Sequence, residues 1–162
     1  MDDWSISKSL GKCFGTGRQI LPSEEYFAAL VETEQGLQRR DFNSDYWNTN
    51  KPVVYCFWKT RMAQADQGKR MFVDDDMLMS FFERLAAETE QERINFRFVI
   101  MLILMRKRRL KYDLTKIENG REIWRLRITG SDQYVDVVNP HLDQGQIEQL
   151  STQIGQILQA DL

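Results

Sequence analysis

Apolar residues in the middle of the chain recur at helical spacing and predict two packed helices. The first helix follows the acidic residues at 74–76 and carries four apolar side chains on one face: Leu78, Phe81, Phe82 and Leu85. Intervals of three and four residues place these side chains on one side of a helix. The second helix is predicted from Gln91 to Arg109, and its segment Phe98 to Met105 is apolar on all sides. Because such a segment must be enclosed by its neighbours, we expect a central buried helix pair.

The last third of the chain alternates apolar and polar residues and predicts a β-meander followed by a helix. Three strands are predicted: Lys111 to Ile117, Arg121 to Thr129 and Tyr134 to Val138. Asn119-Gly120 joins the first two, because this dipeptide favours the left-handed conformations of a tight hairpin turn. Asn139-Pro140 ends the third strand, and Asp143 can cap a final helix that runs to about Leu158.

The first third of the chain predicts three more strands and a short helical turn. The strands are expected at Tyr26 to Glu32, Leu37 to Phe42 and Val53 to Lys59, with Gly36 in the turn between the first two. The third of these is apolar on both faces, which predicts burial on both sides. Ser44 is expected to cap the helical turn that carries Tyr46 and Trp47.

Together these elements predict an α+β fold. Its parts are an N-terminal β-hairpin or ribbon-like segment, a central buried helix pair, a three-stranded antiparallel meander and a C-terminal helix. We divide the chain into a ribbon-like β segment at residues 1–62 and a segment at residues 63–162 that holds the helices and the meander. A length of 162 residues favours one compact unit made of both segments.

A glycine turn, a hairpin and an aromatic helix start follow one another in the first third. The turn reads Cys13-Phe14-Gly15-Thr16-Gly17-Arg18, and the helix start reads Asp41-Phe42-Asn43-Ser44-Asp45-Tyr46-Trp47. In this order the three parts resemble a treble-clef or zinc-ribbon module, whose zinc ligands come in pairs from a knuckle and from a helix start. The corresponding positions here hold Cys13 and Thr16 in the knuckle, and Asn43 and Tyr46 at the helix start.

The resemblance implies a degenerate module without zinc. A structural zinc needs four ligands, mostly thiolate or imidazole, and Cys13 alone is left as a vestigial ligand position. It also implies that Phe14, Phe42, Tyr46 and Trp47 pack where the metal would be, and that the module binds proteins or nucleic acids. The alternative is a hairpin that happens to follow a glycine turn. The remainder of the chain resembles no characterised family.

Composition and charge exclude several classes of protein. Apolar residues make up 42% of the chain, and the formal net charge is -2, which excludes simple disorder and a globally basic nucleic-acid binder. Two cysteines, Cys13 and Cys56, do not make a disulfide framework. The start Met1-Asp2-Asp3-Trp4 lacks the features of a signal peptide, and the apolar stretch at 98–105 is far shorter than the roughly 20 residues of a membrane span. We therefore expect a soluble cytoplasmic protein that does not bind membranes.

Cations gather at the end of the second predicted helix and on the strand beyond the hairpin. The run consists of Arg106, Lys107, Arg108, Arg109 and Lys111, and the strand carries Arg121, Arg125 and Arg127. If the hairpin brings Arg125 and Arg127 to the face of the run, these side chains form a surface for RNA phosphates or for an acidic protein. The alternative is a solvated helix end that complements the helix dipole, with strand arginines paired to Asp113, Glu122 or Asp136.

No arrangement of residues indicates catalysis, a metal site or a cofactor. His141 is the only histidine, and nothing in the sequence places a cysteine or serine beside it. The acidic residues at 74–76 should cap a helix rather than bind magnesium, because consecutive side chains at a helix start point in different directions. Cys56 is expected to be a buried, inert thiol, and Cys13 the more exposed and more reactive one.

These observations favour a non-catalytic protein-interaction or adaptor module with an unidentified protein partner. Exposed aromatic residues such as Trp4, Trp47 or Trp58 would anchor that partner. The second hypothesis is an RNA- or ribonucleoprotein-binding protein that uses the basic run at 106–111, and the third is an enzyme of unknown class. A homodimer is compatible with each, since the apolar helix is a large surface for one small chain to cover.

Overall fold

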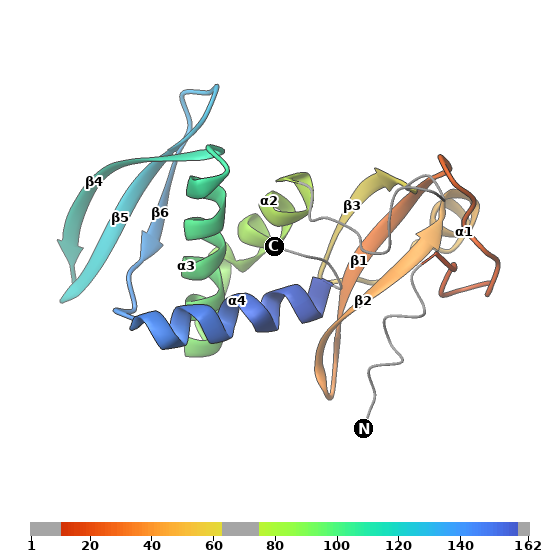
Figure 1. Ribbon diagram of the computed structural model, residues 1–162, viewed down its shortest axis with the longest axis horizontal. Coiled ribbons are helices and arrows are strands. Elements are labelled where there is room, and N and C mark those ends of the chain that lie inside the picture. The colour runs from red at the N-terminus through yellow and green to blue at the C-terminus, as the bar shows by residue number, and fades with distance from the viewer. Residues whose placement is uncertain (1–10, 63–74, 159–162) are drawn as a thin grey trace. The chain divides into compact units, whose positions relative to one another are not determined.

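The computed structural model describes residues 11–62 and 75–158, which form two compact units (Figure 1). The first unit comprises residues 11–62 together with 156–158, and the second comprises residues 75–155. Each unit contains helical residues and a three-stranded antiparallel sheet, so the predicted α+β class is confirmed. Trp4 and Asp74 lie outside the described residues. None of the helices in the two described ranges has the length and hydrophobicity that a bilayer-spanning segment requires.

The sheet of the first unit has its first strand in the centre. Strands β1 (Glu25–Thr33), β2 (Gly36–Asn43) and β3 (Cys56–Arg61) run antiparallel in the order β2-β1-β3. β1 and β2 pair without interruption, which confirms the predicted hairpin. Gly36 adopts a φ of 105° in the turn, a conformation that costs glycine little because it has no Cβ.

Strand β3 lies at an edge of this sheet, and the prediction that it is buried on both sides was wrong. Cys56 and Trp58 face the interior, whereas Phe57 is 48% exposed. Val53 precedes the strand and is 93% exposed. The ring of Phe57 instead packs beside Trp47, with centroids 5.0 Å apart. An apolar run therefore arises here from lateral aromatic packing rather than from enclosure by two layers.

Helix α1 (Ser44–Asn50) begins after an asparagine cap. Asn43 has an extended backbone, and its side-chain oxygen accepts a hydrogen bond from the Tyr46 backbone N–H over 2.6 Å. The Ser44 hydroxyl donates instead to the carbonyl of Glu25. The predicted Ser44 cap was therefore one residue late, because asparagine and serine are equally suited to this position.

A buried ion pair lies on the inner face of the first sheet. Arg39 donates from Nε to Asp41 across 3.0 Å, and the two side chains are 1% and 2% exposed. Arg39 also donates to the carbonyl of Leu158 over 2.8 Å and to the Tyr26 hydroxyl over 3.3 Å. Burial raises the pKa of Asp41, and the charge of Arg39 opposes that rise. The arginine thus ties two strands of the sheet to the last described residue.

The second unit contains the predicted helix pair. Helix α2 (Asp75–Arg84) and a short 3-10 turn (Leu85–Ala87) bury the four residues of the predicted apolar face. Helix α3 (Gln91–Arg106) buries seven side chains around its circumference, which confirms the expectation from its all-round apolar sequence. Replacing a buried Phe of this pair, such as Phe81 at 0% exposure, by Ala is expected to cost about 3–5 kcal/mol.

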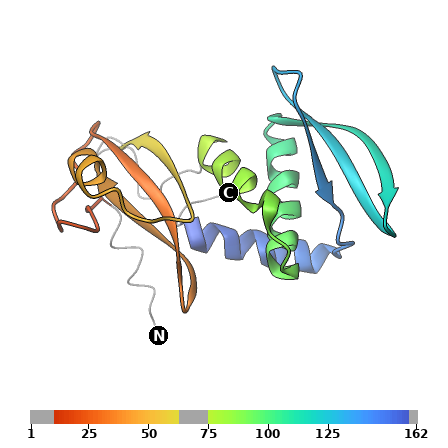
Figure 2. The same cartoon turned by 180° about the vertical axis from the view of Figure 1, so that it is seen from behind.

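A three-stranded meander packs against helix α3. Strands β4 (Leu110–Glu118), β5 (Arg121–Ile128) and β6 (Tyr134–Val138) pair antiparallel in that order, and both views show α3 beside the sheet (Figures 1 and 2). Asn119 and Gly120 have φ angles of 53° and 77°, as the predicted hairpin turn requires. Helix α4 (Gln144–Leu158) begins where Asp143 accepts a hydrogen bond from the Gln146 N–H, which confirms the predicted cap.

Candidate interaction surface

The basic run forms the C-terminal end of α3. The helix ends at Arg106, three residues before the predicted end, because Arg108 leaves it with a left-handed φ of 64°. The N–H of Arg108 bonds to the carbonyl of Met105, and that of Arg109 bonds to the carbonyl of Leu104. These two bonds close a Schellman motif, in which glycine is the preferred left-handed residue.

Two cations of the run are neutralised by the start of helix α2. Lys107 Nζ lies 3.6 Å from one Asp75 oxygen, and an Arg109 nitrogen lies 3.3 Å from the other. Arg109 also approaches Asp76 at 3.9 Å. Asp75 and Asp76 therefore combine a position in the first turn of α2 with ion pairs to the run. Across residues 11–62 and 75–158, three or more acidic, thiol or imidazole groups nowhere converge on a metal position.

Three of the remaining cations lie on the side of the second sheet that faces away from α3. Trp124 packs edge-on against Phe98 of α3 at 5.5 Å, and Leu126 is fully buried. Because side chains alternate along a strand, Arg125 and Arg127 point to the opposite face. Lys111 lies directly opposite Arg127 in the β4–β5 register and shares that face. We call Lys111, Arg125 and Arg127 the basic face, whereas Arg106 and Arg108 are exposed at the helix end.

Lys111, Arg125 and Arg127 form no ion pair with the acidic residues proposed as their partners, although Asp136 stands opposite Arg125 in the β5–β6 register. Within the described part of the chain, no carboxylate lies within 4 Å of Lys111, Arg125 or Arg127, although Arg127 donates to the Ser131 carbonyl over 3.3 Å. Asp136 pairs with Lys116 at 3.1 Å instead. Directly opposed like charges on neighbouring strands destabilise a sheet, so the pair of Lys111 and Arg127 is unfavourable for folding.

Two exposed residues complete this surface, and the sequence did not indicate either of them. Tyr134 stands opposite Arg127 on β6, is 45% exposed, and has the guanidinium of Arg125 4.8 Å from its ring centre. Leu114 is 41% exposed and stands opposite Arg125. It reaches the outer face because a bulge between Tyr112 and Leu114 shifts the register, and strict alternation along the strand could not predict that shift.

The partners of Glu122 are Trp124, Asn139 and His141, and not the strand arginines. Its Oε2 accepts from the Trp124 indole at 2.8 Å and from the Asn139 amide at 2.9 Å. These two hydrogen bonds lower the pKa of Glu122. His141 lies in a left-handed turn with its Nε2 3.7 Å from the other oxygen of Glu122. The histidine therefore contributes to a turn in the second unit, in agreement with its predicted role.

Cys13 is buried in the knuckle, and the expectation that it is the more exposed thiol was wrong. It is 1% exposed, compared with 7% for Cys56. Burial opposes ionisation of the Cys13 thiol, but its hydrogen bonds with the Thr16 side chain and with the backbone of Asn43, Thr16 and Gly15 outweigh that effect and lower its pKa. The thiol is thus held by the knuckle and by the helix cap and is closed to solvent.

An aromatic cluster fills the space between knuckle and helix. Phe42 stacks on Tyr46 with centroids 5.6 Å apart, and Phe14 meets Phe42 edge-on at 6.1 Å. The Tyr46 ring lies directly on Gly15, so closely that a Cβ there would overlap it. Trp47 is half-buried in this cluster and Trp58 is only 4% exposed. Neither tryptophan is therefore the exposed anchor that the sequence suggested.

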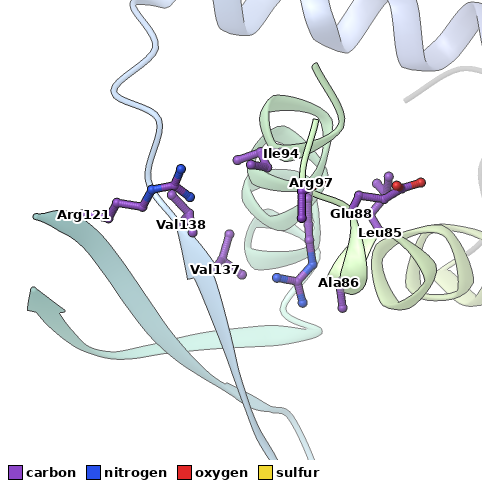
Figure 3. Close-up of a pocket in the computed structure, with 9 residues that line it drawn as sticks. Leu85, Ala86, Glu88, Ile94, Arg97, Arg121, Val137 and Val138 are labelled. Carbon is purple, nitrogen blue, oxygen red and sulfur yellow. The ribbon is translucent and has the colours of Figure 1, made fainter. Parts of the chain in front are cut away.

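The second unit also has a small hollow of about 200 Å³ (Figure 3). Arg97 from α3 and Arg121 from β5 line it together with Glu88 and Val137. Arg97 is already engaged, since it donates to the carbonyls of Phe82 and Asp136, and Glu88 pairs with Arg93 at 3.0 Å. Ligand pockets are usually larger, about 300–1,000 Å³. The hollow brings together no acid, base and nucleophile that could act jointly.

No family model, curated protein or solved structure matches this chain.

Proposed function

We propose that the protein is a non-catalytic interaction module that binds an acidic protein partner through the basic face. The observation that carries this proposal is the direct opposition of Lys111 and Arg127, with no carboxylate in ion-pair range of either within the described residues. An arrangement that weakens the sheet is a reason to look for a binding role, since strain of this kind is offset when a partner supplies the missing charge.

An acidic protein fits this surface better than RNA does. The basic face is small, because Lys107 and Arg109 are paired with Asp75 and do not extend it. Tyr134 offers no open stacking platform, since Arg125 already lies over its ring. RNA binding through a positive surface relies on many phosphate contacts and open aromatic rings. Leu114 supplies instead the apolar contact that a protein partner can bury.

We further infer that the first unit is a degenerate, zinc-less treble clef that serves as a scaffold. The four positions of the resemblance support this inference: the Cys13 thiol contacts residues 16 and 43, and the Tyr46 ring covers the knuckle at Gly15. Aromatic packing takes the place of the metal. Both cysteines are free thiols, which is consistent with a proposed location in the reducing cytoplasm.

Affinity capture from a native lysate, with and without nuclease treatment, tests the proposed function. Wild-type protein is compared with the double variant Lys111→Glu/Arg125→Glu and with the matched control Arg18→Glu/Lys51→Glu. The control reverses two exposed cations of the first unit. Proteins captured by the wild type and by the control, and lost with the double variant, support the proposal. Capture that survives the Lys111 and Arg125 reversal contradicts it, and capture that disappears with nuclease favours RNA instead.

A further inference from the structure

Strand β4 is an edge of its sheet. The order β4-β5-β6 gives it β5 as its hydrogen-bonded neighbour on one side. Within residues 11–62 and 75–158, no strand pairs with its other side. At nine residues it is longer than the other edge strand, β6, which has five. A free strand edge presents backbone N–H and C=O groups in the pattern that another strand can complete.

β4 also exposes more apolar surface than an edge strand usually does. Tyr112, Leu114 and Ile117 are 44%, 41% and 68% exposed. After the bulge, the segment from Leu114 to Glu118 pairs regularly with β5, so its remaining backbone groups follow the alternation that a further strand requires. Proteins normally protect such edges with lysines and bulges. The bulge between Tyr112 and Leu114 interrupts the edge for any strand, whereas Lys111 disfavours neutral or basic strands only.

We propose that the partner is an extended acidic segment that adds to β4 as a fourth antiparallel or parallel strand. This inference rests on the proposed function and specifies its partner. Strand addition uses main-chain hydrogen bonds for affinity and alternate side chains for specificity. The same lysine that discourages association with a neutral edge then selects a segment that carries carboxylates.

The two faces of β4 define what the partner's side chains meet. On the outer face a glutamate carboxylate lies next to Lys111, within the field of Arg127 directly behind it in the register, and the methylene groups of a second glutamate lie next to Leu114. On the face towards α3, apolar side chains meet Tyr112 and Ile117. The expected sequence therefore alternates acidic and apolar residues, and Lys116 contributes little because Glu118 and Asp136 already hold it at 3.1 Å.

The experiment titrates the full-length protein with a short synthetic peptide that alternates Glu and Val, while amide hydrogen exchange is followed residue by residue. Two control peptides accompany it: one has the same composition with the Glu residues grouped together, and the other has N-methyl groups on alternate backbone nitrogens. The Lys111→Glu/Arg125→Glu and Arg18→Glu/Lys51→Glu variants are titrated in parallel. Single-stranded oligouridine is the probe for RNA binding.

Strand addition predicts that exchange slows by about tenfold or more at alternate amides of Leu110–Glu118. It also predicts that the grouped and N-methylated peptides bind at least about tenfold more weakly, because they lack the alternation or the backbone donors. Unchanged exchange along β4, or equal binding of the N-methylated peptide, overturns the inference. If the alternating peptide still binds through Lys111 and Arg125 without protecting β4, only strand addition fails and the proposed function stands. Binding of oligouridine in place of every peptide overturns both.

Discussion

Lys111 of β4 and Arg127 of β5 stand directly opposite each other on the outer face of the second sheet. Two cations in this position repel each other, and the described residues place no carboxylate within ion-pair range to offset that repulsion. Two other cations of the same unit, Lys107 and Arg109, are paired with Asp75. This difference between paired and unpaired cations is the main reason to propose that the basic face binds a partner.

Reversing the charge at position 111 should stabilise the fold while abolishing partner binding. Lys111→Glu places a carboxylate opposite Arg127, and an opposite-charge cross-strand pair contributes about 0.2–1 kcal/mol. Urea unfolding measures the gain, with Arg18→Glu as the control because Arg18 is exposed in the other unit. A Lys111→Glu variant that is less stable than the wild type would show that the two cations do not repel each other.

Replacing Arg108 by glycine removes a cation and should stabilise the fold, because Arg108 has a left-handed backbone conformation. A non-glycine residue at the left-handed position of a helix end is disfavoured by about 1–2 kcal/mol, so Arg108→Gly should raise the free energy of unfolding by about 1 kcal/mol. Arg106→Gly is the matched control, because it removes a cation from the last helical position of α3 and should lower stability by up to about 1 kcal/mol. Equal losses for both variants would contradict the assigned Schellman geometry.

The sequence predicted most elements because their local signals agree with their surroundings. Helix α3 is apolar on all sides from Phe98 to Met105 and buries most of these side chains, and Asn119-Gly120 adopts the left-handed turn for which these residues are suited. The predicted helix nevertheless ended three residues late, since Arg108 gives no sequence signal for a left-handed conformation. Phe57 was placed in the interior because composition does not distinguish lateral aromatic packing from enclosure.

The candidate surface was predictable only in part, because it depends on register. Eight cations were named, and the β4–β5 register brings three of them, Lys111, Arg125 and Arg127, to one face. The ion pairs of Lys107 and Arg109 join residues distant in the chain and could not be read from the run itself. Leu114 was not predicted to belong to the surface, because the bulge beside Asp113 moves its side chain to the outer face of the sheet. Tyr134 was not predicted either, because the residues beside it, Arg125 and Arg127, belong to another strand.

The buried pair of Arg39 and Asp41 should behave as a unit. Removing one partner of a buried ion pair leaves an uncompensated charge and costs about 3–5 kcal/mol. Arg39→Met and Asp41→Leu should therefore each destabilise the protein by that amount, while the double variant should cost far less than their sum. Urea unfolding of the four proteins in the double-mutant cycle measures the coupling. Additive losses would show that the two side chains act independently.

The four positions of the knuckle and helix start provide a test of the treble-clef inference. A Thr16→Cys/Asn43→Cys/Tyr46→Cys variant joins three thiols to Cys13 and removes the ring that covers Gly15, so it should bind cobalt with the absorption of a tetrahedral thiolate site. Thr16→Cys alone is the control, because two thiols do not complete such a site. If the triple variant is folded and shows no cobalt–thiolate absorption, the four positions do not converge as a zinc knuckle requires.

The dissociation constant of the alternating Glu/Val peptide tests the role of the basic face most directly. Calorimetry measures it at low and high salt for three proteins: the wild type, the Lys111→Glu/Arg125→Glu variant and the Arg18→Glu/Lys51→Glu control. We predict binding to the wild type and to the control that weakens as salt screens the charges, and no binding to the variant with a reversed basic face. Equal affinities for all three proteins, unaffected by salt, would contradict the account.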